Sequence, residues 1–268
     1  MRIPLAITLA ITLTLIAGAV SLAAQTRYTG PRTAWGKPDL NGIWQAINTA
    51  DWDLLPHAAA QSPVLALGAA GAQPPGLGVV EGDEIPYLPA AAAKKKQNGA
   101  HWLTEDPEVK CFLPGVPRAT YMPYPFQIVQ TAGNVLIAYQ FAGAVRMIPL
   151  KARASDSPVD SWMGDSFGRW EGDVLVIDAK GFTDTTWFSR AGDFHSDALH
   201  VVERYTPLSH DAIQYEATIE DPQTFSRPWK ISMPLYRHLE KNAQLLEFKC
   251  VEFVEELMYG PLRKQTSK

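Results

Sequence analysis

Apolar and polar residues alternate along much of the second half of the chain, which predicts β-strands with one buried face. The clearest alternation covers residues 213–219 and 229–235. Glu171-Gly172-Asp173 is typical of a tight hairpin. Shorter β-branched or aromatic runs, separated by turn residues, lie at residues 125–131, 135–141, 144–150, 166–170 and 174–179. The even spacing of strands and turns predicts an antiparallel meander.

The number of predicted strands favours a single all-β barrel. Residues 40–45, residues 200–205 and a closing strand at residues 245–253 bring the count to about ten, with one or two short helices. A closed or nearly closed antiparallel barrel removes the edges that so many strands would expose. Gly42-Ile43-Trp44 also resembles the N-terminal signature of lipocalin-like barrels, in which the tryptophan plugs the closed end. We therefore expect a lipocalin-like barrel.

The chain before residue 101 has a different character. Residues 24–56 form an arm and the first strand, and residues 57–100 are rich in Ala, Pro and Gly without a clear period. This composition predicts an irregular surface excursion. Its end favours a short helix, with Pro89 at the first position and Gly99 just after the last. Residues 101–268 form the main part of the same β domain and begin with a proline-rich loop.

The N-terminus has the features of an export signal. Arg2 gives a short cationic start, residues 3–20 carry no charge, and Ser21-Leu22-Ala23 offers small residues where a signal peptidase reads. We expect residues 1–23 to be cleaved and the mature protein to be periplasmic or secreted, without membrane attachment. An uncleaved anchor is the alternative, because the uncharged run approaches the length that spans a bilayer.

Export changes the interpretation of the two cysteines. Cys111 and Cys250 are the only pair, and an oxidising compartment favours a disulfide between them. Two separate buried thiols are the alternative.

Composition narrows the classes of partner. The 268-residue chain is 46% hydrophobic, which is enough for a full core. Its net charge of −4 gives no basic surface, so nucleic acid is not an expected partner.

The chain carries no nucleotide or haem motif, and we expect no cofactor. The four-residue spacing between His195 and His200 matches no strong metal-ligand pattern, so no metal site is assigned. The sequence does not indicate an oligomeric state.

Four longer runs carry a second resemblance: DPEVKCFLPGVPR, GDSFGRWEGDVLVIDAKGFTD, FHSDALHVVERY and IEDPQTFSRPW. Together they resemble a large family of exported, functionally uncharacterised bacterial proteins. The resemblance extends from the Gly-x-Trp strand to Cys250 and implies that the four runs belong to one domain. It brings no activity that can be carried over.

The densest set of titratable groups lies in the third of these runs. Asp197 is close enough in sequence to orient the imidazole of His195 and raise its basicity, as a general base requires. In a regular strand His200 and Arg204 share one face, and Glu203 lies on the other. We therefore predict that His200, Arg204 and His195 form the inward set. The alternative is that these side chains only make structural contacts.

Other residues are candidates for ligand contacts. Arg118 suits bidentate binding of a carboxylate or oxyanion, with a structural salt bridge as the alternative. Asp165 is expected at a pocket mouth or as a turn-former. Aromatic side chains are expected either to fill the core or to stack on a flat ligand, and the candidates are Trp170, Trp187, Phe194 and Tyr205.

Three hypotheses for function follow. The first is an exported enzyme for hydrolysis, elimination or isomerisation of an apolar or aromatic small molecule, with His195 as acid/base, Asp197 as its orienter and Arg118 or Arg204 holding an anion. The second is a lipocalin-like ligand-binding protein with an apolar cavity. The third is an envelope accessory protein without a pocket. Ser196 lies in no Gly-x-Ser-x-Gly elbow, so a serine hydrolase is not expected.

Overall fold

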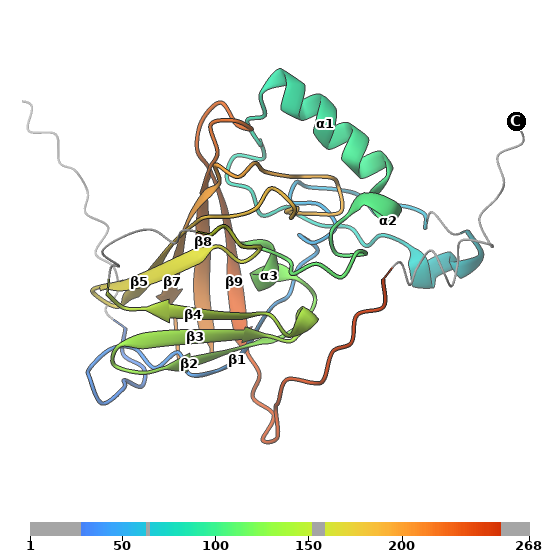
Figure 1. The fold of residues 1–268 in the computed structure, drawn as a ribbon. Coiled ribbons are helices and arrows are strands. Elements are labelled where there is room, and N and C mark those ends of the chain that lie inside the picture. The colour runs from blue at the N-terminus through green and yellow to red at the C-terminus, as the bar shows by residue number, and fades with distance from the viewer. Residues whose placement is uncertain (1–27, 63–64, 152–158, 253–268) are drawn as a thin grey trace, which may run out of the picture.

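A nine-stranded antiparallel sheet dominates the computed structural model, which describes residues 28–62, 65–151 and 159–252. The sheet curls into a nearly closed barrel in the order β4-β3-β2-β1-β9-β8-β7-β6-β5 (Figure 1). The predicted all-β meander is therefore confirmed. The strands are β1 (Gly42–Ala46), β2 (Phe126–Gln130), β3 (Asn134–Tyr139), β4 (Val145–Pro149), β5 (Asp165–Glu171), β6 (Val174–Lys180), β7 (His200–Pro207), β8 (Ala212–Glu220) and β9 (Trp229–Arg237).

The unsealed join of the barrel, which we call the seam, lies between β4 and β5. Each of the strand pairings is antiparallel, so an odd number of strands brings β4 and β5 together pointing in the same direction. A parallel pair needs a different hydrogen-bond pattern from the rest of the sheet. No ladder joins the two strands within the described ranges. Strand parity thus excludes an antiparallel ladder at the seam.

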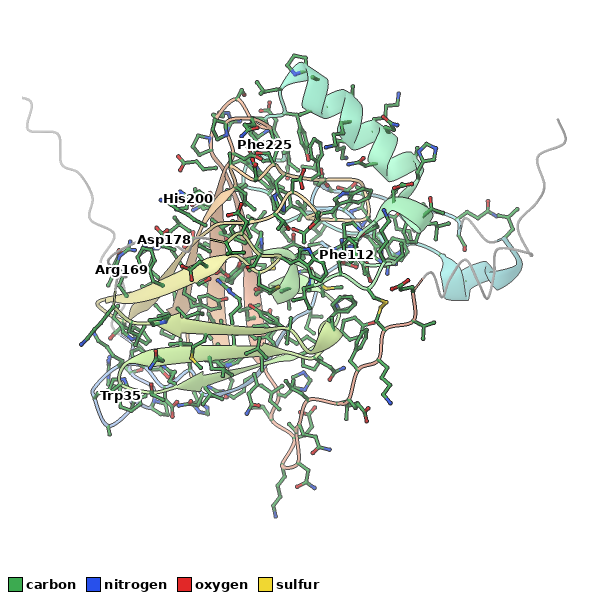
Figure 2. The ribbon with its side chains drawn as sticks, viewed as in Figure 1. Trp35, Phe112, Arg169, Asp178, His200 and Phe225 are labelled. Atoms are coloured by element: carbon green, nitrogen blue, oxygen red, sulfur yellow. A yellow bond between two sulfur atoms is a disulfide. The ribbon has the colours of Figure 1, made fainter. Side chains whose placement is uncertain are left out.

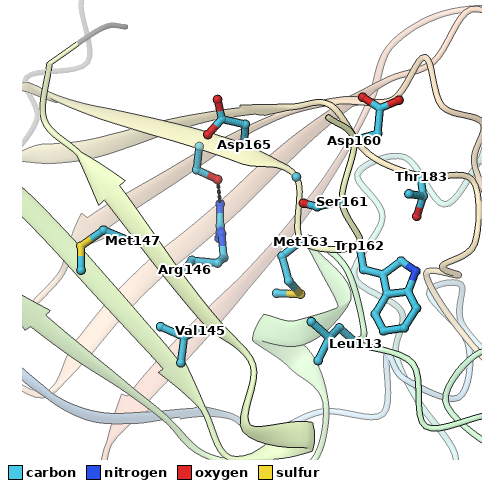
Figure 3. Close-up of a pocket in the computed structure, with 12 residues that line it drawn as sticks. Leu113, Val145, Arg146, Met147, Asp160, Ser161, Trp162, Met163, Asp165 and Thr183 are labelled. Atoms are coloured by element: carbon cyan, nitrogen blue, oxygen red, sulfur yellow. Dashed lines mark hydrogen bonds between the residues drawn. The ribbon is translucent and has the colours of Figure 1, made fainter. Parts of the chain in front are cut away.

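The seam is closed at one end by packing and bridged at the other by a side chain. A Cβ atom on Gly168 would lie 2.9 Å from Leu150 Cδ2 and 3.1 Å from Ile148 Cγ2, so glycine leaves room for these two side chains against β5. Farther along, Arg146 Nη2 of β4 donates a hydrogen bond to Ser166 Oγ of β5 across 2.9 Å (Figure 3).

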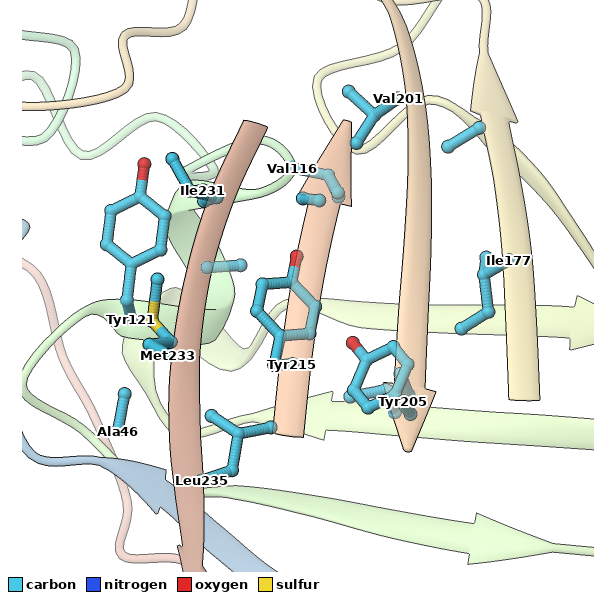
Figure 4. Close-up of a cluster of buried hydrophobic side chains, with 14 of the residues drawn as sticks. Ala46, Val116, Tyr121, Ile177, Val201, Tyr205, Tyr215, Ile231, Met233 and Leu235 are labelled. Carbon is cyan, nitrogen blue, oxygen red and sulfur yellow. The ribbon is translucent and has the colours of Figure 1, made fainter. Parts of the chain in front are cut away.

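The barrel interior is filled by side chains that alternate along the strands (Figure 4). Trp44 of the Gly-x-Trp sequence is fully buried, and its indole N–H donates to Leu40 O across 2.9 Å. The guanidinium of Arg237, from the last strand, lies 4.2 Å from the Trp44 ring centroid. Gly42, at φ +145°, leaves the space that this guanidinium occupies. The tryptophan therefore joins the first strand to the last.

The predicted closing strand at residues 245–253 is wrong. Residues 245–252 form no strand, and residue 253 lies outside the described residues. Strand β9 already has β1 and β8 as neighbours, so no free edge is left there for another strand. The segment instead runs along the outside of the barrel, where Leu246 N donates to Gln140 Oε1 across 2.9 Å.

The predicted disulfide between Cys111 and Cys250 is confirmed, with a Cα–Cα distance of 5.6 Å. Figure 2 shows it beside Phe112. Disulfides are typical of proteins outside the reducing cytosol. The predicted signal peptide lies outside the described residues. Among the described helices, none is long and apolar enough to cross a membrane.

The predicted helix at the end of the 57–100 excursion is present, but it ends later than expected. The helical elements are η1 (Leu65–Gly71), α1 (Pro89–Ala100), α2 (Trp102–Glu105), α3 (Arg118–Tyr121) and η2 (Phe141–Gly143). Pro89 occupies the first position of α1, as predicted. Gly99 lies inside the helix and not after its end. A glycine fits there because α1 packs closely on a loop, and a Cβ atom would lie 2.5 Å from Ala191 O.

Candidate functional site

Strand β7 presents the opposite face to the interior from the one expected. Glu203 and Tyr205 are fully buried, whereas His200 and Arg204 lie on the outer side. The predicted inward set of His200, Arg204 and His195 is therefore wrong. The predicted alternation is correct, but the face that carries Val201 and Tyr205 is the one that packs in the core. Glu203 lies on the same face and is therefore buried with them.

Glu203 is the centre of a polar cluster inside the barrel. Its Oε1 accepts hydrogen bonds from Tyr205 OH at 3.1 Å and Tyr215 OH at 2.9 Å. Its Oε2 accepts from Arg146 Nη2 at 2.6 Å. A buried carboxylate needs such a cation and such donors to offset its lost hydration. The cluster therefore satisfies Glu203 on both oxygens.

Arg146 connects this cluster to the seam. Besides Glu203 it donates to Ser166 Oγ at 2.9 Å and to Tyr139 OH at 3.3 Å. Its Nε–H has no hydrogen-bond partner among the described residues, although only 3% of the residue is exposed. An unpaired buried donor costs about 1–3 kcal/mol. Arg146 is thus the incompletely satisfied member of the cluster.

The tyrosines and the arginine of the cluster stay protonated over the physiological range. Burial, and then the charge of Glu203, raise the pKa of Tyr205 and of Tyr215 well above that of an ordinary phenol. Burial opposes the charge of Arg146, but the attraction of Glu203 outweighs it and the pKa of the guanidinium is raised. The cluster therefore offers fixed hydrogen-bond donors rather than a group poised to exchange protons at neutral pH.

A cavity of about 500 Å³ opens at the wide end of the seam (Figure 3). We call it the seam pocket. Arg146 and Ser166 are its buried polar residues, Asp165 and the exposed Asp160 its acidic ones. The remaining lining residues are Leu113, Val145, Met147, Ser161, Trp162, Met163, Gly164 and Thr183. A cavity of this size can hold a small organic molecule, and its lining mixes polar side chains with apolar ones.

His195 lies away from the seam pocket, in the core. Its Nδ1 is 2.8 Å from Ser196 O, and its Nε2 is 2.7 Å from Thr186 Oγ1, so both ring nitrogens are engaged. Burial lowers the pKa of the imidazole. The expected pair with Asp197 is not formed: Asp197 is exposed and accepts from Gln223 Nε2 at 3.3 Å. The side chain of His195 turns inward while that of Asp197 turns to the surface.

His200 lies on the outer surface between two carboxylates. Its Nε2 is 3.2 Å from Asp178 Oδ1, and its Nδ1 is 3.1 Å from Glu220 Oε2. Figure 2 shows His200 and Asp178 beside each other. His200 and Asp197 line a separate cleft of about 540 Å³ next to residues 220–228. Arg204 is elsewhere on the surface, paired with Glu171 at 2.8 Å.

Arg118 is a structural residue in this fold. Its guanidinium binds Asp106 with two hydrogen bonds, of 2.7 and 2.9 Å, and also binds Asp51 and Glu108, each at 2.8 Å. Arg190 donates to both carboxylate oxygens of Glu108. Arg118 is 1% exposed, so the salt-bridge alternative is the one the structure supports.

The remaining predicted ligand contacts are dispersed. Asp165 lines the seam pocket, and Tyr205 belongs to the cluster beneath it. Trp187 and Phe194 pack with Ala91 under α1. Trp170 is half-buried, with Lys37 Nζ 5.8 Å from its ring centroid. Trp187, Phe194 and Tyr205 are therefore buried in the core, one of the two expected alternatives for the aromatic side chains.

Sequence reasoning missed Arg146, Tyr139 and Tyr215 and gave too little weight to Glu203. Two signals were present in the pattern. Arg146 shares its strand face with Ala144 and Ile148, and Glu203 shares its face with Val201 and Tyr205. A charged residue on an otherwise apolar strand face is a candidate for a buried ion pair.

Comparisons with protein-family models, curated proteins and solved structures found no match. In the part of the chain that the structure describes, no group of three or more His, Cys, Asp or Glu residues is arranged to hold a metal ion.

Proposed function

We propose that the protein binds a small organic molecule in the seam pocket. The observation that carries this proposal is Arg146, a buried cation with an unpaired N–H, in the lining of a cavity of about 500 Å³. A partly satisfied polar network is costly to the fold, and ligand binding is one reason for a protein to retain it. This is the ligand-binding hypothesis, with the site at the seam of the barrel.

The lining indicates the chemistry of the ligand. Arg146 and Ser166 suit an acceptor such as a carbonyl, ether or hydroxyl oxygen at the deep end. Trp162 and Met163 suit an apolar or aromatic body. The tyrosines beneath the pocket remain protonated, which favours binding over proton transfer.

The test is a fragment screen by ligand-observed NMR on residues 24–268, with wild-type protein and the variants Val145→Trp and Val129→Trp. Both valines are exposed, at 53% and 40%, but only Val145 lines the pocket. We expect aromatic fragments with one acceptor to bind wild type and Val129→Trp, and to lose binding when Val145→Trp fills the cavity. Equal binding to all three proteins, or no binding fragment at all, contradicts the proposal.

The same proposal locates the protein outside the cytoplasm. The disulfide and the charge-free N-terminal run both support export. Intact mass of the protein from a periplasmic or culture-medium fraction is expected to correspond to a chain beginning at Ala24. A full-length chain recovered from the cytoplasm contradicts it.

An acid–base enzyme is the second candidate, and one observation favours it. His200 contacts two carboxylates at the edge of the 540 Å³ cleft, an arrangement that orients an imidazole for proton transfer. A panel of hydrolase, lyase and isomerase substrates is the test. Turnover that His200→Gln abolishes and Val145→Trp leaves intact supports this candidate, and turnover unaffected by His200→Gln excludes it.

A further inference from the structure

A smaller cavity adjoins the seam pocket on the side of α1. Its volume is about 260 Å³, and we call it the lysine cavity. Lys94 and Asn98 come from α1, Lys110 and Phe112 from the following loop, and Thr185 and Trp187 from the segment after β6.

Two contacts place the cavities next to each other. The ring of Phe112, in the lysine cavity, stacks on that of Trp162, in the seam pocket, with centroids 4.7 Å apart and planes at 19°. On the other side, the hydroxyls of Thr183 and Thr185 are 2.7 Å apart, one in each cavity. The Phe112–Trp162 pair is thus a shared wall, with an apolar surface for a ligand that passes over it.

The two cavities differ in charge. Asp160 and Asp165 line the seam pocket, where Arg146 is already paired with Glu203. The lysine cavity has Lys94 and Lys110 against one carboxylate, Glu105, which is 3.1 Å from Lys110. Lys94 Nζ lies 4.3 Å from the Phe194 ring centroid and has no carboxylate within salt-bridge distance in the described ranges. An anionic group is therefore favoured in the lysine cavity and disfavoured in the seam pocket.

We infer that the two cavities form one binding site for an elongated molecule, with an apolar or aromatic body in the seam pocket and an anionic end, such as a carboxylate, at Lys94 and Lys110. This inference rests on the proposed function of the seam pocket. It adds the class of the ligand, an amphipathic organic acid, and its orientation.

The disulfide fixes the wall between the cavities. Cys111 directly precedes Phe112, and its backbone has φ +59°, which is unfavourable for a residue other than glycine. The bond to Cys250 ties this loop to the segment after β9. This covalent tie restricts the motion of the wall, which lowers the entropy lost when a ligand binds across it.

The experiment compares four probes by isothermal titration: 6-phenylhexanoate, 6-phenylhexan-1-ol, 6-phenylhexylamine and the short benzyl alcohol. The three long probes share one body and differ in end-group charge. We expect wild-type protein to bind the acid about two- to fivefold tighter than the alcohol, the size of one partly exposed ion pair. The amine is expected to bind most weakly of the three, and the preference for the acid should shrink at high salt.

Matched variants locate the anionic end. Lys94→Gln combined with Lys110→Gln is expected to remove the preference for the acid and leave binding of the alcohol unchanged. Lys96→Gln, an exposed position on the same helix that does not line the cavity, should retain the preference.

Two contrary results can be told apart. Equal binding of the acid, alcohol and amine, with benzyl alcohol still lost in Val145→Trp, overturns the two-cavity inference and leaves the seam pocket as the site. Binding of no probe, or binding that Val145→Trp does not reduce, overturns the inference and the proposed function together.

Discussion

Removing the cation from the buried cluster tests the physical account of the barrel interior. In Arg146→Met, Glu203 keeps its hydrogen bonds from Tyr205 and Tyr215 but loses the cation 2.6 Å away. Both side chains of the ion pair are at least 98% buried, so solvent cannot replace the lost partner. Breaking a buried pair by removing one partner costs about 3–5 kcal/mol. We expect a loss of that size in the free energy of unfolding.

The double variant Arg146→Met/Glu203→Gln is the informative comparison. Glutamine keeps a carbonyl acceptor for the two tyrosines and removes the buried charge, so most of the penalty should disappear, leaving a loss of about 1–2 kcal/mol. The single variant Glu203→Gln leaves Arg146 unpaired and is expected to lose about 3 kcal/mol or more. The two single losses should therefore exceed the double loss by several kcal/mol.

Urea unfolding followed by circular dichroism measures all four proteins, and equal m-values are required before the free energies are compared. A double variant as unstable as the sum of the single variants would contradict this coupling between Arg146 and Glu203. Such additivity means that Arg146 and Glu203 do not depend on each other.

Three further changes have expected outcomes. Cys250→Ser opens a loop that spans 139 residues and should lower the free energy of unfolding by roughly 5 kcal/mol in the chain-entropy model; urea unfolding equal to that of wild type contradicts this. Burial raises the pKa of Asp51 to about 6 from 3.8, against the pull of Arg118. Between about pH 4 and pH 6, the folded protein therefore keeps Asp51 protonated while the unfolded chain has released this proton. The free energy of unfolding should fall as the pH rises through this range. Asp51→Asn should remove that fall from the pH dependence of the melting temperature, and an unchanged slope would exclude Asp51 as its cause. Gly168→Val forces β4 away from β5 and should cost about 1–3 kcal/mol, whereas Gly133→Val, with open space at its Cβ position, should cost little; similar unfolding midpoints for the two would contradict close packing at the seam.

The strands were predictable because each one carries its own pattern. Residues 212–220 and 229–237 alternate so regularly that one face must be buried, whatever the neighbouring strands are. The hairpin at Gly172, with φ +60°, was equally local. The two cysteines were predictable from their number and the expected compartment.

The candidate site was less predictable because it depends on which strands meet. Arg146 and Ser166 face each other only because the barrel closes between β4 and β5, which no local pattern encodes. The predicted tenth strand, at residues 245–253, made the expected number of strands even. The parallel arrangement of β4 and β5 at the seam was therefore not anticipated. The inward face of β7 was predicted wrongly for a related reason. His200 and Arg204 were taken as the inward residues because of their chemistry, whereas burial of Val201 and Tyr205 decides which face turns inward.

The position of the seam has a consequence for the connectivity of the chain. The first and last strands are hydrogen-bonded neighbours, and the break falls between two strands consecutive in sequence. A circular permutant that begins at β5, joins β9 to β1 and ends at β4 would therefore be a plain up-and-down meander with its termini at the break. In the natural order, the covalent connection from β4 to β5 crosses the one join that lacks backbone hydrogen bonds within the described sheet. Widening that join would break side-chain contacts such as Arg146 to Ser166, but none of the backbone hydrogen bonds between the strands.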